Sequence, residues 1–474
     1  MIEIKGKIRR VGEYLNKIKG IGPTKPIILT IGEFLEKIGE IPPIRTTKWS
    51  FIGSGGCGSR IVSNLADCRI PKKYVAGFLC IDSYEDPLSL LSAEVKTHSV
   101  GEHHGFGGNY TSATKFFKDL FEGKKLFSID GELENELNKS IVSEELENAF
   151  ESEEFPLSEN ATIRKERGDE WKITDREKTY IVKKDGKLNV YEEMEGKREL
   201  INKIDENIKN ADACFLITSS GGATGSSSIP FIAKHIKTEH KIPVITLVVL
   251  PFSHEPTTLF DNTHSSILEL TESADILIAV ENNRFSGYEL LNINKQIIEI
   301  MKYICYPKIY PYGKIFDIAD LAWQAQESSA VLVPSLIQFN SKEWLPSVEK
   351  KFTEWTNEDK KEFTGWLKDK ITENILVGIE EEAIKGGSIY FYFTNDTIRL
   401  ELNKDLDSLN EIIKNAIKEI NPDIPEENLT ISFVRAYEKG FRMLVFHKVD
   451  VNSIRQKYEN KIPKSLREEQ RNLI

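Results

Sequence analysis

Short apolar runs alternate with amphipathic stretches from Trp49 onward, and each run is followed by a turn or a glycine-rich loop. This alternation predicts a doubly wound α/β domain. The runs that we expect to be strands are WSFIG (49–53), VAGFLCID (75–82), ACFLITS (213–219), PVITLVVL (243–250) and DILIAV (275–280). The last four are almost continuously apolar, which is typical of parallel strands that helices cover on both faces.

Two other segments have different patterns. Residues 1–48 combine basic residues with apolar residues at helical spacing and end in a proline pair, which predicts a helical extension and a linker. A charged stretch at about 122–196 interrupts the α/β rhythm and contains the hairpin pattern TYIVKKDGKLNVY, with Asp185-Gly186 at its turn. We interpret this stretch as an insertion, either a solvated excursion or an element that binds a partner.

The second half of the chain predicts a long buried helix and then a smaller α+β domain. The helix is expected in ELLNINKQIIEIMKYI, and a further helix at about 406–420. The strands of the smaller domain are expected at GSIYFYF (387–393), TIRLEL (397–402), LTISFVRA (429–436) and RMLVFHKV (442–449). The boundaries that we expect are 49–288 for the first domain, 289–312 for the central helix, 313–450 for the smaller domain and 451–474 for a polar tail that frays.

Composition narrows the class of protein. With 474 residues, 40% of them hydrophobic, the chain can bury sizeable cores. The net charge of −11 argues against general nucleic-acid binding, which requires clustered basic residues. The five cysteines are odd in number and never spaced as CxxC, so neither a disulfide framework nor a zinc site is indicated. No apolar stretch has the length of a membrane span, and we therefore expect a cytoplasmic protein that is not an integral membrane protein.

The first glycine loop, GSGGCG at 53–58, follows an expected strand and precedes an amphipathic stretch. Its glycines allow the backbone to approach phosphates, and the N-terminus of the following helix supplies free N–H groups. The spacing also satisfies GxGxxG, and Asp82 ends the next strand where an acidic ribose ligand would lie. Taken alone, this loop favours a dinucleotide-dependent enzyme.

The second glycine loop, SSGGATGSSS at 219–228, again follows an apolar strand and begins a helix. Two such loops at two strand ends indicate one polyphosphate held between them, and GFGGN at 105–109, the third glycine loop, is a further candidate wall. The chain has no GxxxxGK[ST] motif. The phosphate charge must therefore be offset by backbone N–H groups, by hydroxyls such as that of Thr224, and by a bound Mg²⁺.

Together the three loops resemble those of the tubulin/FtsZ superfamily. The second glycine loop looks like the signature GGGTGTG, with Ala223 and Ser227 in place of two glycines. The resemblance implies a Rossmann-like GTPase domain that binds GTP or GDP with Mg²⁺. It implies that Mg²⁺ is held through the nucleotide phosphates, and it identifies no protein ligand of the metal. The positions that it places around the nucleotide in these loops and at the end of the second strand are Gly53, Gly55, Gly56, Cys57, Gly58, Asp82, Gly105, Gly107, Gly108, Asn109, Gly221, Gly222, Ala223, Thr224, Gly225 and Ser226.

Three further motifs of the superfamily have counterparts around the base and sugar. PFSHE resembles PFxxE and implies that Glu255 lies near the ribose, whereas Leu259 stands where an arginine is usual. NNR resembles N-D-[KR] and makes Asn282 a candidate reader of guanine, with a turn former as the alternative. Asn294 looks like the second guanine-contacting asparagine, with Asn292 or a plain helix-surface role as alternatives.

GKIFDIADL at 313–321 resembles the superfamily's co-catalytic loop, which reaches the nucleotide of the next subunit. Asp317 and Asp320 fill the positions of its two carboxylates, and Ile315 replaces the usual asparagine. Carboxylates three apart on a helical turn lie on one side, where they can orient a water toward a γ-phosphate. An isolated DxxD is otherwise most often a solvated turn or a helix cap.

The leading interpretation is a GTP-hydrolysing cytoskeletal protein that assembles with itself, head to tail, into filaments. The alternatives are a guanine-nucleotide-dependent binding module that does not polymerise and, less favoured, a dinucleotide-dependent oxidoreductase. Regulatory or membrane-adaptor proteins are conceivable partners. The cluster of His98, His103 and His104 matches no standard metal spacing, and we interpret these residues as polar loop residues.

Overall fold

The computed structural model of this chain describes most of residues 47–463. The gaps are residues 69, 102–104, 130–153, 159–160, 168–169, 176–177, 186, 195, 286–289, 306–309, 313–329, 340–351, 394–401, 427–428 and 436–440. The predicted N-terminal extension, apart from its last two residues, and the loop that contains Asp317 and Asp320 therefore lie outside the described residues.

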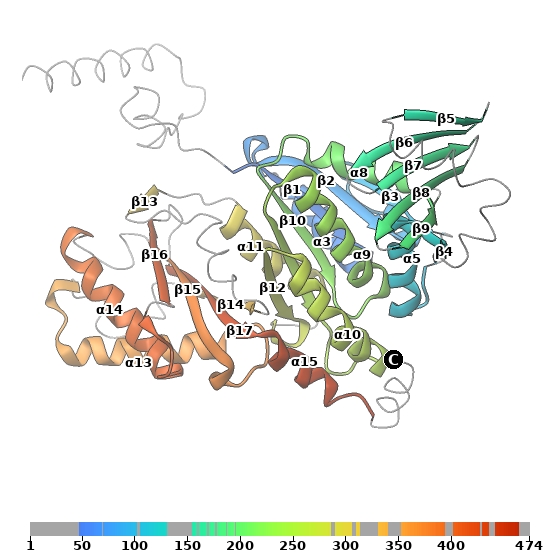
Figure 1. Ribbon diagram of the computed structural model, residues 1–474. Helices are drawn as coiled ribbons and strands as arrows, with labels where there is room; N and C mark the ends of the chain where they lie inside the picture. Colours follow the sequence, from blue (N-terminus) through green and yellow to red (C-terminus); the bar gives the residue numbers. More distant parts are fainter. Residues whose placement is uncertain are drawn as a thin grey trace, which may run out of the picture. The chain divides into compact units, whose positions relative to one another are not determined.

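A sheet of eleven strands runs through the described chain, in the order β13-β16-β15-β17-β14-β12-β11-β10-β1-β2-β3 (Figure 1). Its parallel part consists of β1 (Trp49–Ser54), β2 (Val75–Asp82), β3 (Lys96–Ser99), β10 (Ala213–Ser219), β11 (Val244–Leu250) and β12 (Ile276–Glu281). All five predicted strands of the first domain are thus confirmed. β1 pairs with β2 on one side and with β10 on the other, so the order of the strands reverses at β1. In an open parallel sheet, ligands bind at such a topological switch point, in the crevice outside the carboxyl ends of the strands.

Helices cover both faces of the parallel strands, which explains their continuous apolar character. Alternate residues point to opposite faces, so Phe51 and Phe215 share one core and Ile52 and Leu216 the other. The first core contains residues of α3 (Gly55–Asp67) and α11 (Leu290–Cys305). The second contains residues of α5 (Tyr110–Glu122), α8 (Lys197–Ile208), α9 (Ala223–His235) and α10 (Thr257–Ser273). The shorter helical elements are α4 (Glu85–Ser89), η1 (Lys72–Tyr74), η2 (Ile236–His240), η3 (Asn282–Arg284), η5 (Phe352–Glu354) and η6 (Glu381–Ala383).

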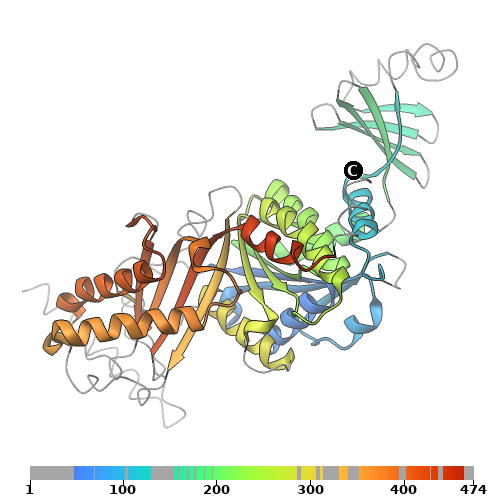
Figure 2. The same cartoon turned by 90° about the horizontal axis from the view of Figure 1, so that it is seen from below.

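The C-terminal strands continue the same sheet. They are β13 (Tyr310–Tyr312), β14 (Ala330–Phe339), β15 (Ile384–Phe393), β16 (Leu429–Arg435) and β17 (Phe441–Asp450). The sequence predicts a separate small sheet, but the pair Ile278–Leu332 joins β12 to β14. α13 (Asn357–Glu373) and α14 (Leu402–Ile420) lie side by side (Figure 2), and both contribute to the core on one face of these strands. Of the predicted strand 397–402, only Leu402 is described, and it begins α14 instead.

The residues after 450 do not fray at once. They form α15 (Val451–Glu459), which buries Val451, Ile454 and Tyr458 and contacts α10. The prediction of a frayed tail is therefore wrong for this helix, because three apolar positions on one face suffice to dock an otherwise polar segment. Among the described helices, none has both the length and the apolar character to span a bilayer.

The charged insertion contains an antiparallel sheet of six strands in the order β4-β9-β8-β7-β6-β5. These strands are β4 (Lys124–Ile129), β5 (Glu154–Ser158), β6 (Ala161–Arg167), β7 (Glu170–Asp175), β8 (Lys178–Asp185) and β9 (Lys187–Glu192). The predicted hairpin is confirmed by the pairing of Asp185 with Lys187. The sequence pattern did not predict the other four strands.

His447 of β17 makes the C-terminal part of the sheet sensitive to acid. Its side chain is buried, its Nε2 lies 2.8 Å from Ser335 Oγ, and burial lowers its pKa from 6.5 to about 4. Between pH 6.5 and pH 4, the imidazole of His447 is therefore protonated to a greater extent in the unfolded chain than in the folded chain. We expect the free energy of unfolding to fall by up to about 3 kcal/mol as the pH is lowered from 6.5 to 4.

Urea titrations across this pH range test the expectation. His447→Gln keeps a hydrogen-bonding group beside Ser335 but does not titrate, so its stability should change less with pH over the same range. Equal slopes for the two proteins would show that His447 is not the source of the acid sensitivity.

Candidate functional site

The first and second glycine loops meet at the switch point of the sheet. β1 ends at Ser54 and α3 begins at Gly55, while β10 ends at Ser219 and α9 begins at Ala223. Neither helix has a side-chain hydrogen bond at its N-cap residue. Backbone N–H groups of two helix N-termini are therefore gathered at one edge of the sheet, where they favour an anion.

Close approach of the two loops demands glycine at two positions. Gly55 has a φ of 72°, and a Cβ built on it would lie 3.1 Å from the backbone nitrogen of Gly225. A Cβ on Gly225 would overlap Thr218 Oγ1 and lie 2.5 Å from the carbonyl oxygen of Ser54. The hydroxyls of Ser54 and Ser228, 2.6 Å apart, also connect the end of β1 to α9. The two loops thus form one interlocked surface.

The third glycine loop is attached to the same surface. Ser83 accepts at its carbonyl from Gly105 N (3.1 Å), and its hydroxyl lies 2.5 Å from Thr224 Oγ1. Asn262 of α10 donates from Nδ2 to the carbonyls of Gly108 (2.9 Å) and Gly221 (2.8 Å). The structure therefore brings the three predicted loops together, with Ser83 and Asn262 as connecting residues that the sequence did not indicate.

Asp82 and Arg60 place opposite charges beside the first glycine loop. A Cβ on Gly56 would lie 3.8 Å from Asp82 Oδ2 and 3.5 Å from an Arg60 nitrogen, and Arg60 Nε donates to the Gly56 carbonyl at 2.8 Å. Burial raises the pKa of the Asp82 carboxyl, against the opposing effect of the N–H groups of Ser83 and Tyr84 and of the Arg60 charge. Arg60 is a cation near the loops that the sequence argument did not anticipate.

Several predicted loop residues have side chains that serve the fold. Asn109 caps α5 by accepting from Ser112 N at 2.9 Å, and buried Ser226 donates to the Gly222 carbonyl at 2.5 Å. Burial raises the pKa of the Cys57 thiol to about 11, so the thiol is neutral. Gly53 and Gly58 belong to the packing of the first loop, because a Cβ on either would overlap a carbonyl oxygen.

The PFSHE segment lies near the same loops. Glu255 accepts from Phe252 N at 2.6 Å, and its charge contributes to the raised pKa of Cys57 in the first glycine loop. Leu259 packs against the second loop, with its Cβ 3.1 Å from a Cβ built on Gly221. An aliphatic side chain thus occupies the flank where the superfamily has an arginine.

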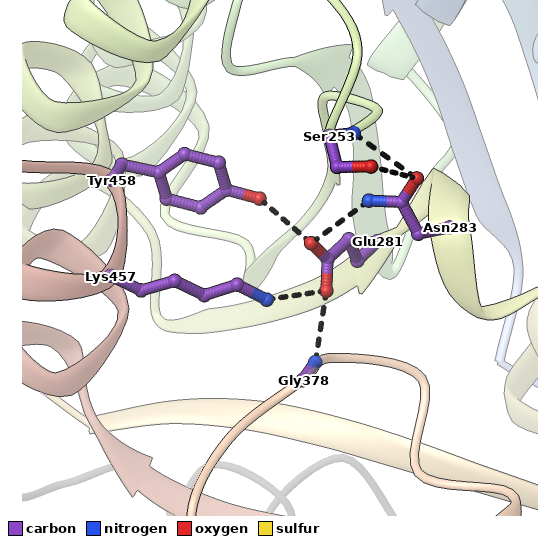
Figure 3. A network of polar contacts seen from close by, with 6 residues as sticks. All are labelled: Ser253, Glu281, Asn283, Gly378, Lys457 and Tyr458. Atoms are coloured by element: carbon purple, nitrogen blue, oxygen red, sulfur yellow. Dashed lines mark hydrogen bonds and ion pairs between the residues drawn. The ribbon is translucent and has the colours of Figure 1, made fainter. Parts of the chain in front are cut away.

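A buried carboxylate supports the loop that follows β12 (Figure 3). Glu281 accepts from Lys457 Nζ (2.6 Å), Gly378 N (2.9 Å), Asn283 Nδ2 (3.3 Å) and Tyr458 OH (3.4 Å). Burial alone would raise the pKa of Glu281, but the Lys457 charge and these hydrogen bonds hold it below its usual value. α15 is thereby bonded to the residue that precedes the candidate base-reading asparagine.

Asn283 extends this network toward PFSHE, since its Oδ1 accepts from Ser253 N at 3.1 Å and from Ser253 Oγ at 3.3 Å (Figure 3). Asn282 is half-buried in η3, and Asn294 is buried on α11, the next helix. The alternative residue, Asn292, is half-buried on the same helix. A role of these asparagines in reading guanine stays a prediction.

Removing the cation of this network should destabilise the protein. Lys457→Met leaves the Glu281 carboxylate, whose side chain is 3% exposed, without its charged partner. We expect a loss of about 3 kcal/mol in the free energy of unfolding, since breaking a buried ion pair leaves an uncompensated charge. Chemical denaturation measures the loss.

Two comparisons make that test specific. Lys461→Met removes a neighbouring lysine that stacks on Tyr458 and Phe260, and it should cost about 1 kcal/mol or less. Adding Glu281→Gln to Lys457→Met should recover part of the lost stability. Equal losses in the two lysine variants would contradict the assigned role of Glu281.

Five of the residues singled out in the sequence are not part of the described loops. His98 is not a loop residue, because it lies in β3 with a buried side chain, 3.5 Å from a Glu199 oxygen; that part of the prediction is wrong. The sequence did not predict the short strand β3, because its residues, KTHS, are polar and show no alternation of apolar and polar positions. His103, His104, Asp317 and Asp320 lie outside the described residues.

Comparisons with known proteins agree with this geometry. A family model described as the GTPase domain of the Tubulin/FtsZ family matches residues 175–288, which contain the second glycine loop, PFSHE and NNR. The mitochondrial division protein fszB of Dictyostelium discoideum is 33% identical over 100 residues, 21% of this chain and 26% of that protein. The cell division protein FtsZ of Aquifex aeolicus is 32% identical over 104 residues, 22% of this chain and 28% of that protein. The aligned segments thus span about a quarter of the length of these relatives.

The likeness in fold extends much further along the chain. CetZ2 of Haloferax volcanii, solved as a GTPγS-bound protofilament, superimposes with a TM-score of 0.57 over 90% of this chain and 100% of that chain. The two sequences are 13% identical in this comparison, so it establishes the fold alone. The fold class predicted from the sequence, a mostly parallel Rossmann-like sheet with a long helix and a further α+β part, is confirmed.

Proposed function

We propose that this chain, which is similar to FtsZ proteins in part of its sequence and in its fold, binds GTP or GDP with Mg²⁺ across the carboxyl ends of β1 and β10 and hydrolyses GTP when it assembles with other copies. The observation that carries the proposal is the interlock of Gly55 with Gly225. Two helix N-termini that approach this closely, with no side-chain cap, gather N–H donors suited to a polyphosphate. A single glycine loop would suit a dinucleotide equally well.

The residues present fit a nucleotide with its metal ion. The N–H groups of the two loops offset phosphate charge in place of a P-loop lysine, and the Arg60 guanidinium adds a positive charge at Gly56. The hydroxyl of Thr224 and the carboxylate of Asp82 supply oxygen ligands of the kind that Mg²⁺ prefers. When bound, Mg²⁺ neutralises charge on the β- and γ-phosphates.

The sugar and base would contact residues on the other side of the loops. We assign Glu255 to the ribose and Asn282 and Asn294 to the edge of guanine. Glu281 and Asn283 support this arrangement, because their hydrogen bonds join the NNR loop to Ser253 of PFSHE. Leu259 replaces the arginine on one flank with a neutral contact.

Hydrolysis needs a second copy in this proposal. Asp317 and Asp320 of one subunit would reach the γ-phosphate of the next and orient the attacking water. A contact between two different faces repeats without closing, so assembly yields an open filament rather than a dimer. The CetZ2 protofilament gives a precedent for such assembly on this fold.

GTP-dependent sedimentation and phosphate release test the proposal together. We expect the protein to pellet with GTP and to release phosphate at a rate per subunit that rises with protein concentration, because each active site needs a neighbour. Release at a rate per subunit independent of concentration would contradict completion of the site by another copy.

A guanine-nucleotide-dependent binding module that does not polymerise is the second candidate. Leu259 favours it, because the loss of a charged side chain beside the second glycine loop reduces the groups available to stabilise the developing charge. GTP binding without pelleting and without phosphate release would select this function. A dinucleotide-dependent oxidoreductase would use the first glycine loop and Asp82 but leaves the second loop without a purpose.

A further inference from the structure

A second cluster of chemically active side chains lies at the end of α9 remote from the second glycine loop. His235 is the last residue of α9, His240 is the last residue of η2, and Asp205 lies on the neighbouring helix α8. The Nε2 atoms of both histidines are 2.8 Å from the same oxygen, Asp205 Oδ1. All three ligand atoms lie within 4.8 Å of one another.

The backbone is shaped to bring the two histidines together. In a regular α-helix, residues five apart point about 140° away from each other. Here the residues Ile236–His240 form a π-helical turn, closed by the hydrogen bond from Lys241 N to the Ile236 carbonyl at 3.1 Å. This wider turn carries His240 back to the side of His235, and their ring centroids are 5.8 Å apart. Single π-turns occur frequently at functional sites.

The surroundings suit a cation. The cluster lies at the C-terminal end of α9, where the helix dipole favours positive charge. The side chains of His235, His240 and Asp205 are 13%, 26% and 40% exposed, so an ion can reach them from solvent without the cluster being fully hydrated. Two nearby lysines are engaged elsewhere, since Lys234 lies 3.8 Å from Glu122 and Lys237 lies 2.9 Å from Asp275.

We propose that Asp205, His235 and His240 bind a divalent transition-metal ion of the Zn²⁺ class. The ligands are the two Nε2 atoms and one carboxylate oxygen, and water completes the coordination. Without metal, both Nε2–H groups donate to Asp205; on binding, each proton moves to Nδ1 through solvent and the Nε2 lone pairs turn to the ion. Imidazole nitrogens select Zn²⁺-like ions over Mg²⁺ and Ca²⁺, which prefer oxygen ligands.

The fit requires the three ligand atoms to shift. Ligand atoms about 2.0 Å from a tetrahedral ion are roughly 3.3 Å apart, so the Nε2–Oδ1 separations must open by about half an ångström. The two Nε2 atoms, which lie within 4.8 Å of each other, must reach the same separation of roughly 3.3 Å. The expected effect is structural. The metal would connect α8, the helix after the insertion, to the end of the helix that begins at the second glycine loop.

The test uses the full-length, tag-free protein, stripped with a chelator and freed of nucleotide. Zn²⁺ is titrated by calorimetry in millimolar Mg²⁺, which occupies oxygen-only sites, and Co²⁺ is titrated in parallel to record its visible absorption. We expect one strong site, a low-coordinate Co²⁺ spectrum, and a thermal midpoint that Zn²⁺ raises by a few degrees. His235→Ala, His240→Ala and Asp205→Asn should each weaken Zn²⁺ binding at least about 100-fold.

Matched controls exclude general effects. Glu206→Gln removes the same charge from the next position of α8, where it pairs with Lys96, and His264→Gln removes a histidine from α10; both should bind Zn²⁺ as the wild type does. Metal-free unfolding curves show whether each variant is folded. A wild type without a strong site, or cluster variants that bind Zn²⁺ as tightly as the controls, would overturn the proposal and leave a hydrogen-bonded triad.

Discussion

Asp317→Ala and Asp320→Ala are each expected to reduce GTP turnover by roughly 100-fold or more, with GTP affinity unchanged within a factor of about two. The reason is that, in the proposed function, these carboxylates act on the water that attacks the γ-phosphate held by the next subunit, and they take no part in holding the nucleotide of their own subunit. Polymers of these variants should also disassemble more slowly, because hydrolysis no longer converts the bound GTP. Phosphate release, calorimetry and sedimentation measure the three quantities.

An exposed carboxylate elsewhere provides the control. Asp369→Ala on α13 removes the same charge and should leave turnover unchanged. Wild-type turnover in both loop variants would exclude these residues from the reaction. Loss of GTP affinity in parallel with turnover would instead indicate that the loop contacts the nucleotide of its own chain.

Gly225→Ala is expected to weaken GTP binding roughly 100-fold and to lower the free energy of unfolding by about 1–3 kcal/mol. The added methyl group would overlap Thr218 Oγ1 and lie 2.5 Å from the Ser54 carbonyl, so the two glycine loops must separate. Gly365→Ala is the matched control, because a Cβ there meets no atom within 4 Å. A Gly225→Ala protein that binds GTP like the control would show that the interlock is unimportant for the ligand.

Mixing the two kinds of variant tests completion of the site in trans. Gly225→Ala keeps the acidic loop but binds little GTP, whereas Asp317→Ala binds GTP without the full pair of acids. In a filament in which the two variants alternate, GTP bound to an Asp317→Ala subunit contacts the intact acidic loop of a neighbouring Gly225→Ala subunit. Phosphate release by the mixture should exceed the sum of the separate rates.

The parallel part of the fold was predictable because its strands are buried on both faces. In β10 and β11, nearly every residue of the seven is apolar. Such continuous apolar runs are typical of parallel strands that are covered on both faces. The prediction failed where the pattern was weaker. β14 contains Pro334, which lacks the N–H group of a central strand, and the structure accommodates it because β12 pairs with β14 only at Leu332.

The glycine positions of the candidate site were predictable for a related reason, since close backbone approach admits no other residue. The residues that connect the loops were not. Asn262 bonds to Gly108 and Gly221, which are 154 and 41 positions away, and no local pattern encodes such contacts. Glu281 similarly contacts Lys457 across 176 positions, and it lies directly after the predicted strand 275–280, at the end of β12.

Calorimetric titration of the nucleotide-free protein with GTP, ATP and NAD in the presence of Mg²⁺ tests the central claim most directly. We expect one site per chain that binds GTP at least about tenfold more tightly than ATP or NAD, a difference of about 1.4 kcal/mol. Gly225→Ala should weaken the binding of GTP roughly 100-fold and remove this preference. Equal affinity for the three ligands, or a preference for NAD, would contradict a guanine-nucleotide site built on the two glycine loops.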